Sequence, residues 1–384
     1  MKLLLLDSNS LVNRAYFAMP ALTDPSGRPT GGVFGFVNML VKLIAEEKPT
    51  HIACAFDVHA PTFRHKQYAE YKAGRKPMAE ELKAQIPLLK ELLEKMQIKV
   101  VELAGYEADD ILGTLSKWAC CPTIVVSGDK DVLQLVSDNV TVLHTKRGIT
   151  DVIRYTPARL AEEGLEPSQV PELKGLMGDS SDNIKGVNGV GEKTARQLLA
   201  DYHDLDGIYA HIDEIKGKLR EKLIEGKEDA YFSRDLATIY RSVPLEMTLE
   251  DCVFQPKMSR EVETMLRQLD FRKLVDKFDY IDEPVKVDVE VKTIPVESRA
   301  DFDALMAKAE GAKQIALSLV GESYHLAMDE ATEYVVTPGK DLLSDLDPDH
   351  ILRGLSRLFA KKGFNKVVYD AKSWFYRLGD DFLG

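Results

Sequence analysis

Apolar runs of strand length alternate with segments of helical periodicity through the first 155 residues of the chain. The predicted strands are 3–6, 52–56, 98–103, 123–126, 140–144 and 151–155. The predicted helices are 11–19, 33–46, 78–96, a helix that begins near Glu107, and 132–136. Strands that alternate with helices in this way predict an α/β fold with a mostly parallel central sheet.

The pattern becomes helical after residue 156. The predicted helices there are 157–163, 169–177, 193–201, 206–212, 216–225 and 227–238. A glycine-rich loop at 186–191 lies between two of them, and its glycines permit tight turns and close backbone approach. We therefore expect an α/β domain over 1–170 and a helical subdomain over 171–282.

Residues 283–296 are rich in Pro, Val, Lys, Asp and Glu without a helical period, which predicts a linker. A second α/β pattern follows it. The predicted elements are helices at 302–310 and 351–361 and strands at 314–320, 333–336 and 366–369. Because the chain stops at Gly384 soon after these elements, we expect a partial domain over 297–384 and a fragment of a longer protein.

The chain has 384 residues, of which 45% are hydrophobic, enough for two or three domains with sizeable cores. No apolar run approaches the length of a membrane span, and the four cysteines have no metal-ligand spacing. We therefore expect no membrane association and a reducing, cytoplasmic setting. The formal charge of −12 argues against a polyanionic partner as a total, but affinity for nucleic acid depends on local basic patches.

One such patch lies in residues 61–76. Its cations are Arg64, Lys66, Lys72, Arg75 and Lys76, and its aromatic residues are Phe63, Tyr68 and Tyr71. Only Glu70 opposes the positive charge. The patch is either a DNA-binding segment or an ordinary exposed charged loop, and its position directly after an acidic strand end favours DNA binding.

Carboxylates gather at the ends of the predicted strands. Asp7, Asp57, Asp129 and Asp131 follow apolar strands, and Glu107, Asp109 and Asp110 open a predicted helix. The carboxyl ends of parallel strands meet at one edge of a sheet, so these acids are expected to converge. A site made of carboxylates without His or Cys favours a hard divalent ion such as Mg²⁺ or Mn²⁺.

These residues resemble the structure-specific 5′-nucleases, or flap endonucleases, in the form found at the N-terminus of bacterial DNA polymerase I. The resemblance covers residues 1 to about 280. The matching motifs are Leu6-Asp7-Ser8, Ala55-Phe56-Asp57, Thr62-Phe63-Arg64, Tyr71-Lys72-Ala73-Gly74-Arg75, Tyr106-Glu107-Ala108-Asp109-Asp110, Ser127-Gly128-Asp129-Lys130-Asp131, Gly178-Asp179-Ser180-Ser181-Asp182-Asn183-Ile184 and Gly191-Glu192-Lys193-Thr194-Ala195. Any single motif is weak evidence, whereas the ordered set is specific.

The resemblance implies two divalent metal ions. It assigns one ion to Asp7, Asp57, Glu107 and Asp109 and the second to Asp129, Asp131, Asp179 and Asp182, with Asp110 near both. Lys72 and Arg75 match basic residues of a helical arch that face the scissile phosphate, where they would act in catalysis. Two metal ions of this kind activate water and stabilise the leaving oxygen of an in-line displacement.

The resemblance also implies a DNA-binding set and a helix-three-turn-helix element, commonly with a bound K⁺. The expected DNA-binding residues are Arg64, Lys66, Tyr71, Lys76, Lys185, Gly186, Gly189, Gly191, Lys193 and Thr194. Tyr71 could stack on a terminal base. Lys185 stands where relatives usually carry proline. The lysine at this position should be tolerated or should add a phosphate contact.

Residues from about 295 resemble the start of a 3′-5′ exonuclease-type domain. A working domain of this type needs Asp-x-Glu on its first strand, whereas residues 314–320 read Gln-Ile-Ala-Leu-Ser-Leu-Val. Asp370 could match a later acid, but alone it would not assemble a two-metal site. We therefore expect this region to be inactive.

The sequence thus predicts a structure-specific 5′-nuclease that cuts flapped or branched double-stranded DNA, as part of a DNA polymerase I active in primer removal and repair. Its expected partners are the DNA and a polymerase domain in cis. Two alternatives remain open: a free-standing 5′-nuclease, and a module that binds flap junctions without cutting them.

Overall fold

The structure is a computed structural model that describes residues 1–147, 151–281, 291–329, 331–339, 345–361, 365–368 and 374. The chain forms two compact units, Met1–Asp282 and Glu283–Gly384, and each is described separately. Residues 283–290 of the predicted linker, Tyr369 and Asp370 lie outside the described residues.

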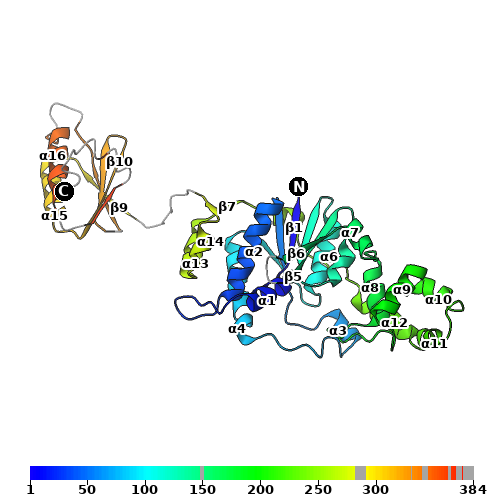
Figure 1. The fold of residues 1–384 in the computed structure, drawn as a ribbon. Helices are drawn as coiled ribbons and strands as arrows, with labels where there is room; N and C mark the ends of the chain where they lie inside the picture. Colours follow the sequence, from blue (N-terminus) through cyan, green and yellow to red (C-terminus); the bar gives the residue numbers. More distant parts are fainter. Residues whose placement is uncertain are drawn as a thin grey trace. The chain divides into compact units, whose positions relative to one another are not determined.

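A six-stranded sheet in the order β3-β2-β1-β4-β5-β6 forms the centre of the first unit (Figure 1). Its strands are β1 (Leu3–Asp7), β2 (His51–Ala55), β3 (Lys99–Val101), β4 (Thr123–Ser127), β5 (Val140–Arg147) and β6 (Asp151–Tyr155). Neighbouring strands are parallel except β6, which is antiparallel to β5. This confirms the predicted α/β fold with a mostly parallel sheet.

Hydrophobic cores cover both faces of this sheet because side chains alternate along each buried strand. In β1, Leu3 and Leu5 belong to one core, and Leu4 and Leu6 belong to the other. Helices α1 (Ser8–Ala18), α2 (Gly31–Glu47), α5 (Gln85–Lys95) and α13 (Arg260–Gln268) pack in the second core, and α6 (Ala108–Trp118) packs in the first. Helices α2 and α6 accordingly lie on opposite sides of the sheet in Figure 1.

The predicted helix over 78–96 is divided into α4 (Glu80–Lys83) and α5. Pro87 has no amide proton, so the hydrogen bond to the carbonyl of Lys83 that a continuous helix would need cannot form. The side chain of Gln85 also turns inward, where its Oε1 accepts from the amides of Gly32 (2.8 Å) and Val33 (3.3 Å). The predicted helix at 132–136 is a 3₁₀ helix, η1 (Asp131–Leu135).

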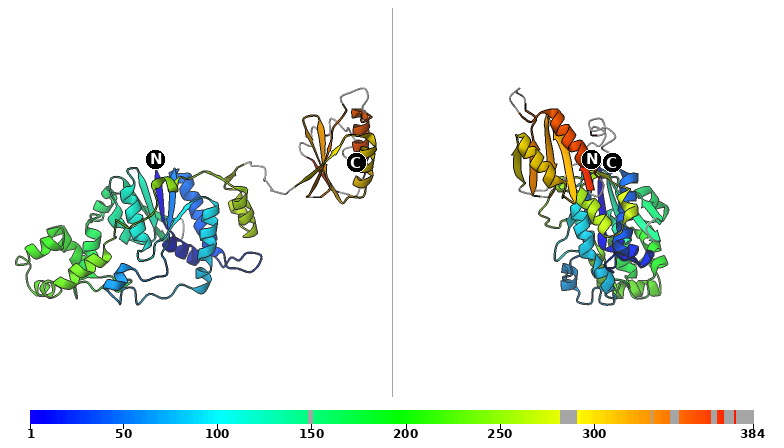
Figure 2. Two further views of the ribbon diagram at one scale, coloured as in Figure 1. Left: turned by 180° about the vertical axis from the view of Figure 1, so that it is seen from behind. Right: turned by 90° about the vertical axis from the view of Figure 1, so that its left-hand side faces the viewer.

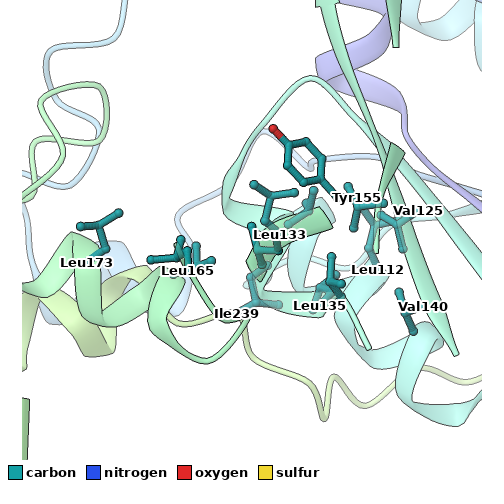
Figure 3. Close-up of a cluster of buried hydrophobic side chains, with 14 of the residues drawn as sticks. Leu112, Val125, Leu133, Leu135, Val140, Tyr155, Leu165, Leu173 and Ile239 are labelled. Carbon is teal, nitrogen blue, oxygen red and sulfur yellow. The ribbon is translucent and has the colours of Figure 1, made fainter. Parts of the chain in front are cut away.

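The helical part of the first unit continues from β6. It consists of α7 (Pro157–Glu162), α8 (Gln169–Met177), α9 (Glu192–Tyr202), α10 (Leu205–Ala210), α11 (Lys218–Glu225) and α12 (Lys227–Ala237). One core joins it to the sheet: Figure 3 shows Val125, Leu133 and Tyr155 near the sheet and Leu165 and Leu173 toward the helices. The predicted boundary between residues 170 and 171 falls inside α8, so it does not separate two independent cores.

The second unit contains a five-stranded sheet in the order β13-β10-β11-β12-β9 with two helices. The elements are β9 (Lys292–Val296), α15 (Arg299–Ala309), β10 (Gln314–Val320), β11 (Ser323–Ala327), β12 (Thr332–Val336), α16 (Pro348–Ala360) and β13 (Asn365–Val368). The predicted linker end was wrong, because β9 occupies 292–296, pairs with β12 and buries Val296 in the core. The sequence analysis also did not predict β11, a strand of five residues in which only Tyr324 and Leu326 are buried.

Candidate active site

The carboxyl ends of the parallel strands meet the first turn of α6 and a basic segment that follows β2. In Figures 1 and 2 the N-terminus lies at the upper edge of the sheet and α3 (Phe63–Gln67) lies below the lower edge, so the strand ends face α3. A cavity of about 840 Å³ opens there. Its acids are Asp7, Asp57, Glu107, Asp109 and Asp129, and its cations are Arg14, Lys72, Arg75, Lys76 and Lys146.

Asp7 is buried and Asp57 is exposed at this cavity, and both are held by hydrogen bonds. Asp7 Oδ2 accepts from Ser127 Oγ at 2.6 Å, and Asp57 Oδ1 accepts from the amide of Ala108 at 2.8 Å. Burial, followed by the charge of Asp57, raises the pKa of Asp7 to about 7. Desolvation by the surrounding protein also raises the pKa of Asp57. Both shifts indicate a place where negative charge lacks sufficient compensation.

Asp109 is the acid whose surroundings best fit a cation-binding site. Its Oδ1 is buried without a hydrogen-bond partner in the described chain. Burial and the charge of Asp110 raise its pKa well above the ordinary value. A buried carboxylate oxygen without a partner, surrounded by further carboxylates, fits a hard divalent ion.

The carboxylates are not yet arranged around such an ion. Within the described ranges, no group of three or more His, Cys, Asp or Glu side chains is positioned as a metal-ligand set. Protein cations contact several of the acids instead: Lys72 Nζ lies 2.7 Å from Glu107 Oε1. Side chains would therefore have to move for a metal to bind.

Asp110 and Arg64 differ from their predicted roles. Arg64 is 1% exposed, and its Nη1 and Nη2 each donate to an oxygen of Asp110 at 2.8 Å. The Asp110 oxygens also accept from the amides of Glu107 (3.1 Å) and Tyr240 (2.8 Å). Asp110 therefore has no free oxygen for a metal, and Arg64 cannot reach a phosphate. Both are positioning residues for the first turn of α6.

Lys174 on α8 joins two of the predicted acids, and the sequence did not identify it. Its Nζ lies 2.8 Å from Asp131 Oδ1 and contacts Asp179 Oδ2 closely. Burial and the neighbouring Asp129 nevertheless raise the pKa of Asp131 to about 6. Sequence spacing gave no signal for Lys174, because the contact depends on the packing of α8 against η1.

Residues 68–76 lie against the loop after α8 that carries Asp179 and Asp182. Arg75 Nε donates to Asp182 Oδ1 at 3.1 Å, and Lys72 Nζ lies 3.8 Å from Asp182 Oδ2. Tyr71 is 4% exposed, and its hydroxyl lies within hydrogen-bond distance of both Glu107 Oε2 (3.1 Å) and Asp182 Oδ2 (3.2 Å), to either of which it can donate. Lys72 and Arg75 thus contact acids at this site, and Tyr71 is buried against Glu107 and Asp182, so it has no free face for a base in this arrangement.

The glycine-rich loop connects α8 to α9, and it contains one buried glycine, Gly186, and two exposed glycines, Gly189 and Gly191. Gly186 is buried with a φ of +64°, and its amide donates to Ser233 Oγ at 3.1 Å, so that amide is not available to a phosphate. Gly189 has a φ of +73°, and its carbonyl accepts from Lys222 Nζ at 3.0 Å. Gly191 is the N-cap of α9, which has no side-chain cap.

The remaining predicted DNA-binding residues lie near the surface. Lys66, Lys76, Lys185 and Lys193 are exposed, and Thr194 is partly exposed. Lys193 and Thr194 lie in the first turn of α9, where helix amides have no acceptor within the helix. That turn is suited to a phosphate oxygen.

The fold and the acidic cavity agree with two adjoining family matches. Residues 2–164 match the N-terminal resolvase-like domain of 5′-3′ exonucleases, and residues 165–260 match their C-terminal SAM fold. The chain therefore belongs to the 5′-3′ exonuclease family.

The chain is also similar to bacterial DNA polymerases I. It is 43% identical over 329 residues to DNA polymerase I of Bacillus caldotenax, covering 84% of this chain and 37% of that protein. It is 37% identical over 388 residues to DNA polymerase I of Caldicellulosiruptor bescii, covering 98% of this chain and 44% of that protein. The chain thus spans less than half the length of these relatives.

Solved structures share the fold. The bacteriophage T5 5′-exonuclease with bound zinc ions is 22% identical with a TM-score of 0.52, and the match covers 72% of this chain and 99% of that chain. A T5 flap endonuclease in complex with DNA and metal ions is 20% identical with a TM-score of 0.51, covering 72% and 96%. In the described part of the chain, no helix is long and apolar enough to span a membrane.

Proposed function

We propose that the chain is a divalent-metal-dependent 5′-nuclease that hydrolyses DNA phosphodiesters at 5′ flaps and ends. The observation that carries this proposal is a cavity lined by five acids, including Asp109 with its buried, unpartnered Oδ1, together with Lys72 and Arg75. Acids alone could hold a structural metal. Acids and cations that line the same open cavity can hold a metal and a phosphate together.

Mg²⁺ or Mn²⁺ ions, two by resemblance, would supply an activated water and charge neutralisation at the leaving oxygen. Asp7, Asp57, Glu107 and Asp109 are the proposed residues for one ion. Asp129, Asp131, Asp179 and Asp182 are proposed for the second. Asp110 is not proposed as a metal ligand, because both of its oxygens accept from Arg64, and its role is to position the first turn of α6.

The chain's own cations would handle the phosphate. Lys72 and Arg75 border the cavity, and the Lys76 and Lys146 side chains extend the positive charge along it. Lys72 and Arg75 would neutralise charge that develops on the scissile phosphate, which a carboxylate cavity alone would repel. Lys66, Lys185, Lys193 and the first turn of α9 would hold the duplex backbone without reading its sequence.

Several finer parts of this proposal rest on the relatives. A polymerase domain in cis would place the activity in primer removal and DNA repair, and a nucleoid-associated cytoplasmic setting would follow. A K⁺ at the glycine-rich loop would need carbonyl oxygens such as that of Gly189, to which Lys222 donates. The second unit is proposed to be inactive as a 3′-5′ exonuclease because β10 has no carboxylate.

The test uses a 5′-labelled flap on a nicked duplex with the purified chain, in Mg²⁺ and again in EDTA. Cutting near the junction in Mg²⁺ alone is expected. Asp109→Asn should abolish cutting while flap binding persists, and Asp213→Asn on the exposed surface is the matched control. Tight binding by the wild type without cutting in either Mg²⁺ or Mn²⁺ would favour the junction-binding module instead.

A further inference from the structure

Three aromatic side chains cluster beside the acidic cavity and have no role in the function proposed above. Tyr106 and Tyr240 are stacked, with ring centroids 5.8 Å apart and planes inclined by 21°. The Phe63 ring lies 6.0 Å from each of them at steep angles. Tyr240 is 44% exposed, so a large part of this ring faces solvent.

Tyr106 connects this cluster to a second cavity of about 430 Å³. The two cavities share Asp57, Lys72, Arg75 and Glu107 as lining residues. These four residues form a common border of the two cavities, and Tyr106 lines the second cavity but not the first. A strand that passes this border from the acidic cavity would reach the aromatic cluster next.

The buried Arg64–Asp110 pair fixes the segment that carries Tyr240. Arg64 Nε donates to the carbonyl of Leu236 at 2.8 Å, and its Nη2 donates to that of Thr238 at 2.9 Å. Asp110 Oδ1 accepts from the amide of Tyr240 at 2.8 Å. The backbone is thus held by buried hydrogen bonds, so ordering the ring for a ligand costs little further entropy.

The Tyr240 ring itself is not held by its hydroxyl. Among the described residues, neither the Tyr106 nor the Tyr240 hydroxyl has a hydrogen-bond partner. The feature that the fold presents is the partly exposed ring of Tyr240, stacked on Tyr106, which lines the second cavity. A partly exposed aromatic ring next to Lys72 and Arg75 in this way is suited to stack a nucleobase, independently of its sequence.

We propose that the Tyr106–Tyr240 pair stacks an unpaired base of the displaced 5′ strand, beyond the phosphate held at Lys72 and Arg75. This inference rests on the proposed nuclease function and adds a binding subsite for the single-stranded part of the substrate. The ring of Tyr240 is the contact, and Tyr106 supports it from the opposite face.

The experiment compares Tyr240→Ala and Tyr240→Phe in the full chain. Trp118→Ala is the matched control, because Trp118 is also exposed (37%) and lies at the far end of α6 from Glu107. Each variant is first compared with the wild type by thermal unfolding. KM and kcat are then measured in Mg²⁺ on nicked duplexes with a single-nucleotide flap and with a longer flap.

Tyr240→Ala should raise KM on the longer flap by about 5- to 150-fold, the range for loss of one stacked base, with little change in kcat. The single-nucleotide flap, Tyr240→Phe and Trp118→Ala should each behave like the wild type. In Ca²⁺ in place of Mg²⁺, 2-aminopurine in the flap should be quenched by the wild type and by Tyr240→Phe but not by Tyr240→Ala.

The outcomes separate the two proposals. If the wild type cuts neither substrate, the nuclease proposal fails and the stacking inference fails with it. If the wild type cuts both and Tyr240→Ala retains the wild-type KM and quenching, the cluster is only a packing element and the inference alone is overturned. An equal rise of KM on both substrates would also contradict it, since the single-nucleotide flap should not reach the ring.

Discussion

Replacing Arg64 tests whether this side chain is structural or a DNA contact. In Arg64→Ala, Asp110 would keep only two amide donors in a fully buried position. Removing one partner of a buried ion pair costs about 3–5 kcal/mol. The carbonyls of Leu236 and Thr238 also lose their donors, which adds roughly 1 kcal/mol or more. We expect the free energy of unfolding of the first unit to fall by about 4–6 kcal/mol.

The assay needs a signal from the first unit alone. The chain has two tryptophans, Trp118 in the first unit and Trp374 in the second. In a Trp374→Phe background, fluorescence in urea follows Trp118 at the end of α6. Comparing Arg64→Ala with Arg64→Ala/Asp110→Asn then measures the cost of leaving the Asp110 charge without its partner. The Asn amide removes that charge and keeps an oxygen that accepts from the Tyr240 amide.

The double variant should recover about half of the lost stability, since an uncharged amide is far less costly to bury than an unpaired carboxylate. Arg64→Lys should remain strongly destabilised, because a single ammonium cannot replace a bidentate guanidinium. A loss below about 2 kcal/mol in Arg64→Ala, together with a weaker salt dependence of DNA binding, would refute the structural role and restore the phosphate contact.

Four further predictions concern the acids and the glycine-rich loop. Asp131→Asn should abolish cleavage and largely preserve flap binding; normal turnover would exclude Asp131 from the metal site. Lys174→Met should lower the free energy of unfolding by about 2 kcal/mol in EDTA, with the loss reduced in excess Mg²⁺, as urea titrations in both buffers would reveal. Gly186→Ala should disrupt the loop, because a Cβ there would meet the Gly178 amide nitrogen at 2.2 Å, whereas Gly191→Ala has open space and should bind DNA nearly normally. The pKa of Asp7 is raised from 3.8 to about 7, so between these pH values the folded state binds a proton that the unfolded state has lost. The free energy of unfolding without metal should therefore decrease as the pH rises from about 4 to 7, by up to about 4 kcal/mol. Asp7→Asn should flatten this pH dependence.

The strands and the convergence of most acids could be predicted from the sequence for a physical reason. A strand buried on both faces is a continuous apolar run, so β1, β2 and β4 are recognisable, and their parallel order brings the acids that follow them to one edge. Asp7, Asp57 and Asp129 accordingly line one cavity. Strands β9 and β11 have the same length as β1, β2 and β4 but carry a weaker signal, because many of their residues are only partly buried or exposed.

The partners of the charged residues could not be predicted, because pairing depends on tertiary packing. Arg64 and Lys72 are eight residues apart in one basic stretch, yet Arg64 is buried against Asp110 while Lys72 lies at the cavity. Lys174 carries no motif that distinguishes it from the exposed lysines. Residue type and spacing identify the charged side chains but do not tell which of them are buried or which partners they contact.

The distribution of the cations explains how a chain with a formal charge of −12 can hold so many acids in and beside one cavity. Lys72 contacts Glu107, Arg75 contacts Asp182, and Lys174 bridges Asp131 and Asp179. These contacts reduce the repulsion among the carboxylates while leaving Asp109 Oδ1 without a partner. Arg64 has a different task, since its buried pair with Asp110 fixes both α6 and the segment that carries Tyr240. The fold thus separates the cations that contact the proposed metal-binding acids, which a metal or a phosphate can displace, from Arg64, which must stay in place for the site to keep its shape.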